Sequence, residues 1–266
     1  MEFISVESVA TDISDIKSVI NVINEVIKPP INTIQSRNWI INQSYGGIIN
    51  KELQGPTRES NWLIPKTPNF GSLLVGGYPD KLQYLSAILA AGIDTFVCLN
   101  VEYGRMTDTH IYNSYAVNKL AADKFIHEPI KDMDIGDDDK IKSLCQVIVE
   151  RLYNGENIYL HCSGGHGRTG TVAAIVLHIL YPELNILQIF DYLQFAHDQR
   201  AANYFGEFYF IKWIHSDPLS NYFVKGQVPT PQTSAQRQQV SRIISELILA
   251  NEEVDSDSDF DEDDLE

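Results

Sequence analysis

Residues 161–170 read His-Cys-Ser-Gly-Gly-His-Gly-Arg-Thr-Gly, and this short stretch decides the fold. The apolar run that precedes it, residues 157–161, predicts a buried strand. The run that follows, Thr169 to Leu180, is apolar nearly all round and predicts a central, buried helix. Glycines between the two runs let the backbone turn its N–H groups inward. We therefore expect a strand, an anion-binding loop and a helix in direct succession.

Two side chains of this loop suit chemistry on a bound phosphoryl group. Inward N–H groups and the positive end of the helix would lower the pKa of Cys162 and make it a nucleophilic thiolate. Arg168 can grip two phosphoryl oxygens with its planar guanidinium group. Thr169 can donate a hydroxyl hydrogen bond to the sulfur. The other residues expected to bind the phosphate are Ser163, Gly164, Gly165, His166 and Gly167.

Short apolar runs alternate with helical patterns on both sides of the loop. This alternation favours an α/β fold with a mostly parallel central sheet and helices on both faces. Before the loop, Asp137-Asp138-Asp139 supplies a helix N-cap and first turn, and Gly155 ends that helix. The other expected strands are 72–77, 93–99 and 125–130; the other helices contain 82–89 and 184–197, and a last one is introduced by 229–233.

The 266 residues suit one substantial domain with extensions. We place the domain at residues 61–250. Residues 1–60 form an extension in which isoleucines from Ile13 to Ile27 share one helical face, either packed on the domain or docking a partner. Residues 251–266 form an acidic tail that we expect to be disordered, because it has too little apolar surface to bury.

Charge and composition exclude several classes of protein. The net charge is −16, but ten acidic residues between Glu252 and Glu266 leave only −6 for the rest. A mildly acidic body argues against non-specific binding to nucleic acid or to an anionic membrane. Three scattered cysteines are too few for a disulfide framework or a zinc site. Neither a signal peptide nor a membrane span is expected, so we predict a cytoplasmic protein, with the nucleus equally open.

The stretch from Cys162 to Thr169 resembles the Cys-x5-Arg-Ser/Thr signature of the protein tyrosine phosphatase superfamily. His161 and Gly170 extend the match on either side. Atypical dual-specificity phosphatases are the most similar members, and the likeness covers about residues 61–250. It implies a phosphomonoester hydrolase that works through a phosphocysteine intermediate, with no metal or organic cofactor. Relative to compact members, residues 199–228 form an insertion.

The resemblance also implies a general acid, which protonates the departing oxygen. In compact members this aspartate lies on a loop after a strand, upstream of the cysteine. Asp132 follows such a strand and precedes Cys162 by thirty residues, so it is the first candidate, with Asp134 second. Gln232 and Gln236 lie in a segment that borders the active site in the family and can position water, although a capped helix start explains them more simply.

The residues leave the substrate class open. Lipid phosphatases of the superfamily often carry lysine where this chain has Ser163 and His166, so phosphorylated protein is the favoured partner, with phosphotyrosine first and phosphoserine or phosphothreonine second. His166 is expected at the rim of the pocket. The alternatives are a phosphoinositide phosphatase, an RNA 5′-triphosphatase, or a pseudophosphatase that only binds phosphorylated proteins. The presence of cysteine, arginine and aspartate together argues against the last of these.

Overall fold

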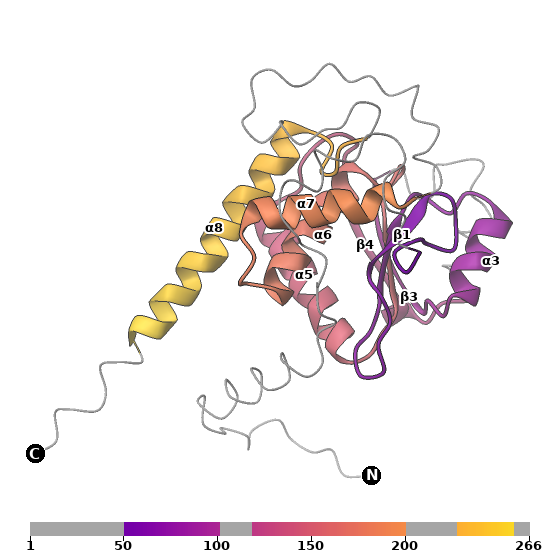
Figure 1. Cartoon of the computed structure of the whole chain (residues 1–266), viewed down its shortest axis with the longest axis horizontal. Helices are drawn as coiled ribbons and strands as arrows, with labels where there is room; N and C mark the ends of the chain where they lie inside the picture. Colours follow the sequence, from indigo (N-terminus) through magenta and orange to yellow (C-terminus); the bar gives the residue numbers. More distant parts are fainter. Residues whose placement is uncertain (1–50, 102–118, 201–227, 258–266) are drawn as a thin grey trace, which may run out of the picture.

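A five-stranded sheet forms the centre of the computed structural model, which describes residues 51–101, 119–200 and 228–257, without the side chains of the last seven (Figure 1). The strand order is β1-β2-β5-β3-β4. Four strands run parallel, and β1 pairs antiparallel with β2 at one edge. The strands are β1 (Ser60–Ile64), β2 (Leu73–Gly76), β3 (Thr95–Asn100), β4 (Phe125–Ile130) and β5 (Ile158–His161).

Helices cover both faces of this sheet, as the sequence predicts. Among the α-helices in the described ranges, α3 lies on one face, and α5, α6, α7 and α8 lie on the other (Figure 1). Each face has its own apolar core. The helices are α3 (Leu82–Ala90), α5 (Asp138–Tyr153), α6 (Gly167–Leu180), α7 (Ile186–Asp198) and α8 (Ser234–Asp257), and a short 3-10 helix (Ala122–Lys124) precedes β4.

The strand–loop–helix unit around Cys162 lies in the middle of the molecule. Strand β5 pairs with β2 on one side and with β3 on the other, so its following loop opens at the carboxyl edge of the parallel strands. Helix α6 is buried along nearly its whole length, which confirms its central position. It begins at Gly167, two residues before the expected start at Thr169, so Arg168 and Thr169 both lie in its first turn.

The residues that begin and end a helix were predicted correctly where they lie next to the helix in the sequence. The side chain of Asp137 caps α5 by accepting a hydrogen bond from the N–H of Lys140, at 3.1 Å. Gly92 and Gly155, which follow α3 and α5, both have positive φ, +87° and +80°. That left-handed conformation is the one expected of a glycine just after a helix end.

Three boundaries differ from the sequence-based ones. Strand β1 is not among the strands expected from the sequence, because a short edge strand has little periodicity to detect. Leu53 is buried in the main core, so packed residues begin before position 61. Helix α8 continues to Asp257, past the expected boundary at 250. The Ile13–Ile27 pattern and the segments 201–227 and 258–266 lie outside the described residues.

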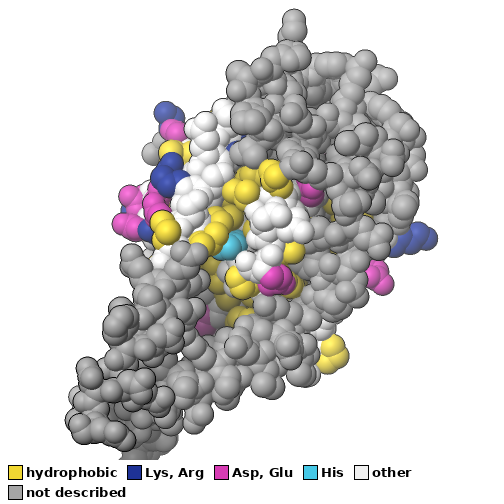
Figure 2. Space-filling model, turned by 60° about the vertical axis from the view of Figure 1, so that its left-hand side comes forward, with side chains coloured by type: hydrophobic (Ala, Val, Ile, Leu, Met, Phe, Trp, Pro, Cys, Tyr) yellow, Lys and Arg dark blue, Asp and Glu magenta, His cyan; other side chains and the backbone are white. Residues whose placement is uncertain are grey.

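Figure 2 shows a face on which hydrophobic side chains gather near the middle of the described surface. Lys and Arg side chains lie at its edges, with acidic side chains close to them. This distribution agrees with the mildly acidic body inferred from composition. In the part of the chain that the structure describes, no helix is long and apolar enough to cross a membrane.

Candidate active site

The loop between β5 and α6 is bent tightly against the end of β2. Gly165 has φ of +73°, a left-handed conformation that glycine adopts without strain. A Cβ atom at this position would collide with the backbone of Gly76. The N–H of Tyr78 donates to the carbonyl oxygen of Ser163 at 2.9 Å, which ties the loop to the same strand end. Glycine is therefore required here both for φ and for close approach.

Cys162 lies at the bottom of a cleft beside this loop, and its side chain is buried. The cleft encloses about 210 Å³, including its open mouth. It brings together residues from the loop, from the segment after β4 and from the segment before α8. The lining residues are Asp132, Met133, Cys162, Gly164, His166, Gly167, Arg168, Gln232 and Gln236.

Hydrogen bonds from both terminal nitrogens of the guanidinium group hold Arg168 in place. Its Nη1 donates to the carbonyl oxygen of Ile130 at 2.8 Å, and its Nη2 donates to Asp132 Oδ1 at 2.7 Å and to Ser163 Oγ at 3.0 Å. The arginine is almost fully buried, whereas 62% of the Asp132 side chain is exposed. A buried guanidinium group with fixed donors is pre-organised to bind an oxyanion, and Asp132 is close enough to act at the same site.

The two candidate acids behave differently. Asp132 contacts Arg168 in the cleft, whereas the Oδ1 atom of Asp134 accepts a hydrogen bond from the N–H of Ile135 at 2.9 Å, within its own turn. Met133, between them, has φ of +61°, an uncommon left-handed conformation for a residue other than glycine. Asp134 is not among the lining residues. The geometry therefore favours Asp132 as the acid.

Gln236 serves as a helix cap and also borders the cleft. Its N–H donates to Thr233 Oγ1 at 3.1 Å, and its Oε1 accepts from the N–H of Thr233 at 3.0 Å, a reciprocal capping box. Its Nε2 donates to the carbonyl oxygen of Asp134 at 3.0 Å. Gln232 also lines the cleft. The segment therefore starts α8 and also borders the cleft; a role of either glutamine in positioning water stays a prediction.

Sequence reasoning missed several residues that support the loop, among them Asn100 and Arg200. Asn100, at the end of β3, donates from Nδ2 to Ser163 Oγ at 2.7 Å. Arg200 donates from Nε to Asn61 Oδ1 at 2.6 Å and from Nη1 to the carbonyl oxygen of Gly164 at 3.4 Å. Burial lowers the pKa of Arg200 to about 10. A polar residue at the end of a buried strand was a usable signal for Asn100; nothing local marked Arg200, which the sequence placed in an insertion.

Two histidines of the loop are held neutral. His161 is buried and stacks on Tyr159 with ring centroids 5.3 Å apart; burial lowers its pKa to about 3. His166 lines the cleft half-buried, and burial lowers its pKa to about 3 as well. Thr169 Oγ1 is buried and has no hydrogen-bond partner within the described ranges. Its expected bond to the sulfur of Cys162 stays a prediction.

No metal site is apparent in the described part of the chain. Within residues 51–101, 119–200 and 228–257, no group of three or more His, Cys, Asp or Glu side chains is arranged to hold an ion.

Comparisons with known proteins agree with this geometry. A family model, "Swiss Army Knife protein, DSP-PTPase phosphatase domain", matches residues 57–184, which include the loop and Asp132. A protein of Invertebrate iridescent virus 6, named as a candidate tyrosine phosphatase, 197R, is 30% identical over 189 residues, which cover 66% of this chain and 66% of that protein. The similarly named 067L of Invertebrate iridescent virus 3 is 35% identical over 108 residues, 39% of this chain and 41% of that one.

The chain belongs to the protein tyrosine phosphatase superfamily, as a member similar to the atypical dual-specificity phosphatases. It spans about two thirds of one viral relative and about two fifths of the other. Among solved structures, a kinase associated phosphatase whose catalytic cysteine was replaced by serine matches 66% of this chain and 88% of its own, at 17% identity and a TM-score of 0.48.

Proposed function

We propose that the chain is a cysteine-dependent phosphomonoester hydrolase that acts on phosphotyrosine, and also on phosphoserine or phosphothreonine, in proteins. One observation supports this most directly. The guanidinium group of Arg168 contacts Asp132 and the loop residue Ser163 in the same cleft that holds Cys162. A nucleophile and a phosphate clamp from the loop therefore meet an acid from the segment after β4 at one point, which is the set of groups that the reaction needs.

In the first step, the thiolate of Cys162 attacks phosphorus, so an S–P bond forms while the P–O bond to the leaving group breaks. Asp132 gives its proton to the departing oxygen. In the free protein Asp132 pairs with Arg168 as a carboxylate. A bound phosphoryl group takes over Nη2 of the arginine, and Asp132 then takes up a proton from solvent, which is the proton that it gives to the departing oxygen. That exchange releases Asp132 towards the leaving group.

In the second step, water attacks the phosphocysteine, Asp132 accepts the proton of that water, and the thiolate leaves. Gln232 is the better of the two glutamines to bind this water. Both ends of the Gln236 amide are already used, by the N–H of Thr233 and by the carbonyl oxygen of Asp134. Gln232 lines the same cleft without these bonds.

The charge of the cleft supports a monophosphate substrate. Among its described lining residues, Arg168 is the only lysine or arginine, and Asp132 adds a negative charge beside it. One buried cation suits one phosphoryl group. A polyphosphorylated headgroup or a triphosphate would bring further charges that these lining residues do not neutralise.

The test is hydrolysis of p-nitrophenyl phosphate and of a phosphopeptide panel by wild type and Cys162→Ser. We expect the serine variant to lose at least about 10³-fold in kcat, because a serine hydroxyl lacks the thiolate nucleophile. Acid-quenched wild type should carry one phosphoryl group on Cys162 by mass spectrometry. Cys145→Ala is the matched control, since that cysteine lies in α5, where its thiol donates to the carbonyl oxygen of Val172.

Two results would contradict the proposal. Full activity in Cys162→Ser would exclude the covalent mechanism. A strong preference for phosphoinositides or for RNA 5′-triphosphate ends over phosphopeptides would exclude the substrate class while keeping the chemistry.

A further inference from the structure

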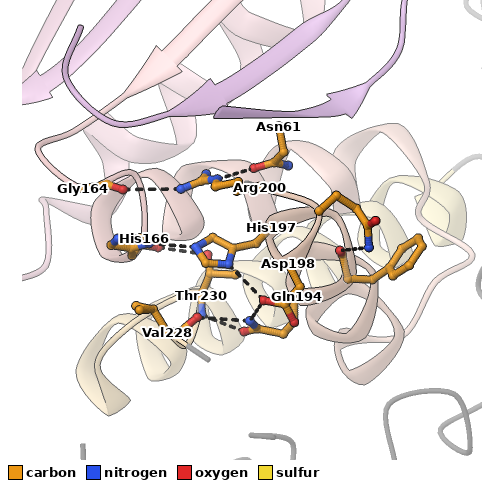
Figure 3. Close-up of polar contacts among 11 residues, drawn as sticks. Asn61, Gly164, His166, Gln194, His197, Asp198, Arg200, Val228 and Thr230 are labelled. Carbon is orange, nitrogen blue, oxygen red and sulfur yellow. Dashed lines mark hydrogen bonds and ion pairs between the residues drawn. The ribbon is translucent and has the colours of Figure 1, made fainter. Parts of the chain in front are cut away.

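A network of buried polar side chains lies directly behind the loop, at the carboxyl end of α7 (Figure 3). Gln194, His197, Asp198 and Arg200 belong to it, and it reaches the cleft through His166. The two-step mechanism above does not use any of them. Buried polar groups are costly to retain, so a network of this size next to the cleft needs an explanation.

The orientation of Gln194 is determined by its partners. The backbone N–H of Thr230 donates to Gln194 Oε1 at 2.9 Å, so this atom is the oxygen end of the amide. The other end, Nε2, donates to Asp198 Oδ1 at 2.9 Å and to the carbonyl oxygen of Val228 at 3.1 Å. Asp198 Oδ1 must therefore accept a hydrogen bond. Burial raises the pKa of Asp198 well above its usual range, but a proton on this carboxyl group would take the other oxygen.

This acceptor sets the tautomer of both histidines. His197 Nδ1 lies 3.2 Å from Asp198 Oδ1 and therefore carries the proton that it donates. Burial, and next the charge of Arg200, hold the pKa of His197 well below its usual range, so the ring is neutral and its Nε2 has no proton. That nitrogen lies 2.7 Å from His166 Nδ1, which must then be the donor. Because His166 is neutral too, its own Nε2 is a bare acceptor.

The edge of the His166 ring that carries this nitrogen lies next to Gly164, and both residues line the cleft. A Cβ atom on Gly164 would come within 2.7 Å of His166 Cδ2 and 2.9 Å of Nε2, so this edge of the ring lies over Gly164. Thr230 Oγ1 donates to the carbonyl oxygen of His166 at 2.9 Å, which fixes the backbone beneath the ring. The ring is therefore held at both its backbone and its Nδ1 edge.

We propose that His166 is a specificity residue that presents an unprotonated Nε2 to the substrate beside the phosphoryl group, and that His197 and Asp198 are positioning residues that keep it in this form. This role rests on the proposed function, and it determines which kind of substrate group can bind in the cleft next to the phosphate. An N–H or O–H donor, such as a main-chain amide or a neighbouring hydroxyl of a phosphopeptide, satisfies Nε2. A second phosphate beside His166 would face the lone pair of Nε2, which repels an anion. Arg168 could not neutralise this second phosphate, because it already binds the first phosphoryl group.

The tautomer is tested without any substrate, by ¹⁵N NMR of the histidine rings in wild type, Asp198→Asn and Asp198→Ala. We expect wild-type His166 and His197 to carry their protons on Nδ1 between about pH 6 and pH 8. Asp198→Asn keeps an acceptor oxygen and should keep both tautomers. Asp198→Ala removes it and should give a mixture. A proton on Nε2 of His166 in the wild-type protein would overturn the inference.

Discrimination is tested with two phosphotyrosine peptides that differ only at the neighbouring residue, serine in one and phosphoserine in the other. Wild type should prefer the serine peptide in kcat/KM. His166→Lys replaces the acceptor with a cation and should shift the ratio towards the doubly phosphorylated peptide by about tenfold. Gln238→Lys adds the same charge on the exposed side of α8 and should leave the ratio unchanged.

The outcomes separate this inference from the proposed function. If wild type hydrolyses neither peptide nor p-nitrophenyl phosphate, the proposed function fails, and the NMR result still decides the tautomer. If it hydrolyses both and His166→Lys does not shift the ratio, the specificity role is wrong. Asp198→Ala provides the second variant, since its mixed tautomers should reduce the wild-type preference, and a full preference there would also contradict the proposal.

Discussion

The two walls of the cleft are built on opposite principles. The acid wall, residues 131–136, is a loop after β4 whose side chains are largely exposed and in which Asp132 contacts Arg168. The relay wall, residues 164–166 backed by His197 and Asp198 of α7, is a chain of hydrogen-bonded side chains that runs from the half-buried His166 into the interior. A group that must change charge and move during the reaction benefits from solvent, whereas a group that only recognises the substrate benefits from a fixed position.

The difference also explains how each wall keeps its geometry. On the acid wall, the side chain of Asp132 is open to solvent, so its contact with Arg168 can be exchanged for a contact with another anion. On the relay wall, burial disfavours the charged form of both histidines. If either histidine lost its present hydrogen-bond partner, a polar group would remain buried without one, which costs free energy. We therefore expect substitutions on the acid wall to change rates, and substitutions on the relay wall to change stability and specificity.

The largest expected effect belongs to the acid wall. Asp132→Asn removes the proton donor and should lower kcat about 10²–10⁴-fold with little change in substrate affinity. Asp134→Asn is the matched control, because its side chain bonds its own turn, and it should stay within about twofold of wild type. The measurement is steady-state kinetics on p-nitrophenyl phosphate. A large loss in Asp134→Asn with an active Asp132→Asn would reverse the assignment of the acid.

An intermediate effect is expected on the relay wall, where the free energy of unfolding should depend on pH. The pKa of His166 falls from 6.5 to about 3 on folding, so the unfolded chain binds the extra proton between those values. Stability is therefore complete above about pH 6.5 and falls as the pH drops, by about 1.4 kcal/mol per pH unit for each such histidine. His166→Gln should lose about 2 kcal/mol less than wild type between about pH 6.5 and pH 5 in urea titrations. Equal losses in the two proteins would show that His166 does not stay neutral.

The smallest expected effects separate the two glutamines. Gln236→Ala removes a capping box and the bond to the carbonyl oxygen of Asp134, and should lower the free energy of unfolding by about 1–2 kcal/mol. Gln232→Ala should leave stability within about 0.5 kcal/mol and slow only phosphocysteine hydrolysis, by a few fold. Thermal unfolding and pre-steady-state bursts measure the two effects. A stability loss in Gln232→Ala, or a larger burst in Gln236→Ala, would exchange their roles.

Much of the fold could be predicted from short stretches, for a physical reason. The order of strand, loop and helix around Cys162 depends on apolar runs and on glycines that act within a few residues. The cap at Asp137 is equally local, since its side chain bonds the N–H three residues later. Strand β1 could not be predicted in this way, because it is stabilised by pairing with β2 and by the apolar face that it covers, and both contacts depend on the tertiary structure.

The candidate site divides in the same way. Residues 161–170 by themselves predicted the nucleophile, the phosphate clamp and the loop between them, because these groups lie on one continuous turn. Only the tertiary structure decided that Asp132, and not Asp134, contacts Arg168. It also decided that Asn100, Arg200 and the pair His197–Asp198 support the loop from other elements. Hydrogen bonds between segments far apart in the chain depend on how strands and helices pack, and no periodicity or spacing within a single segment records that packing.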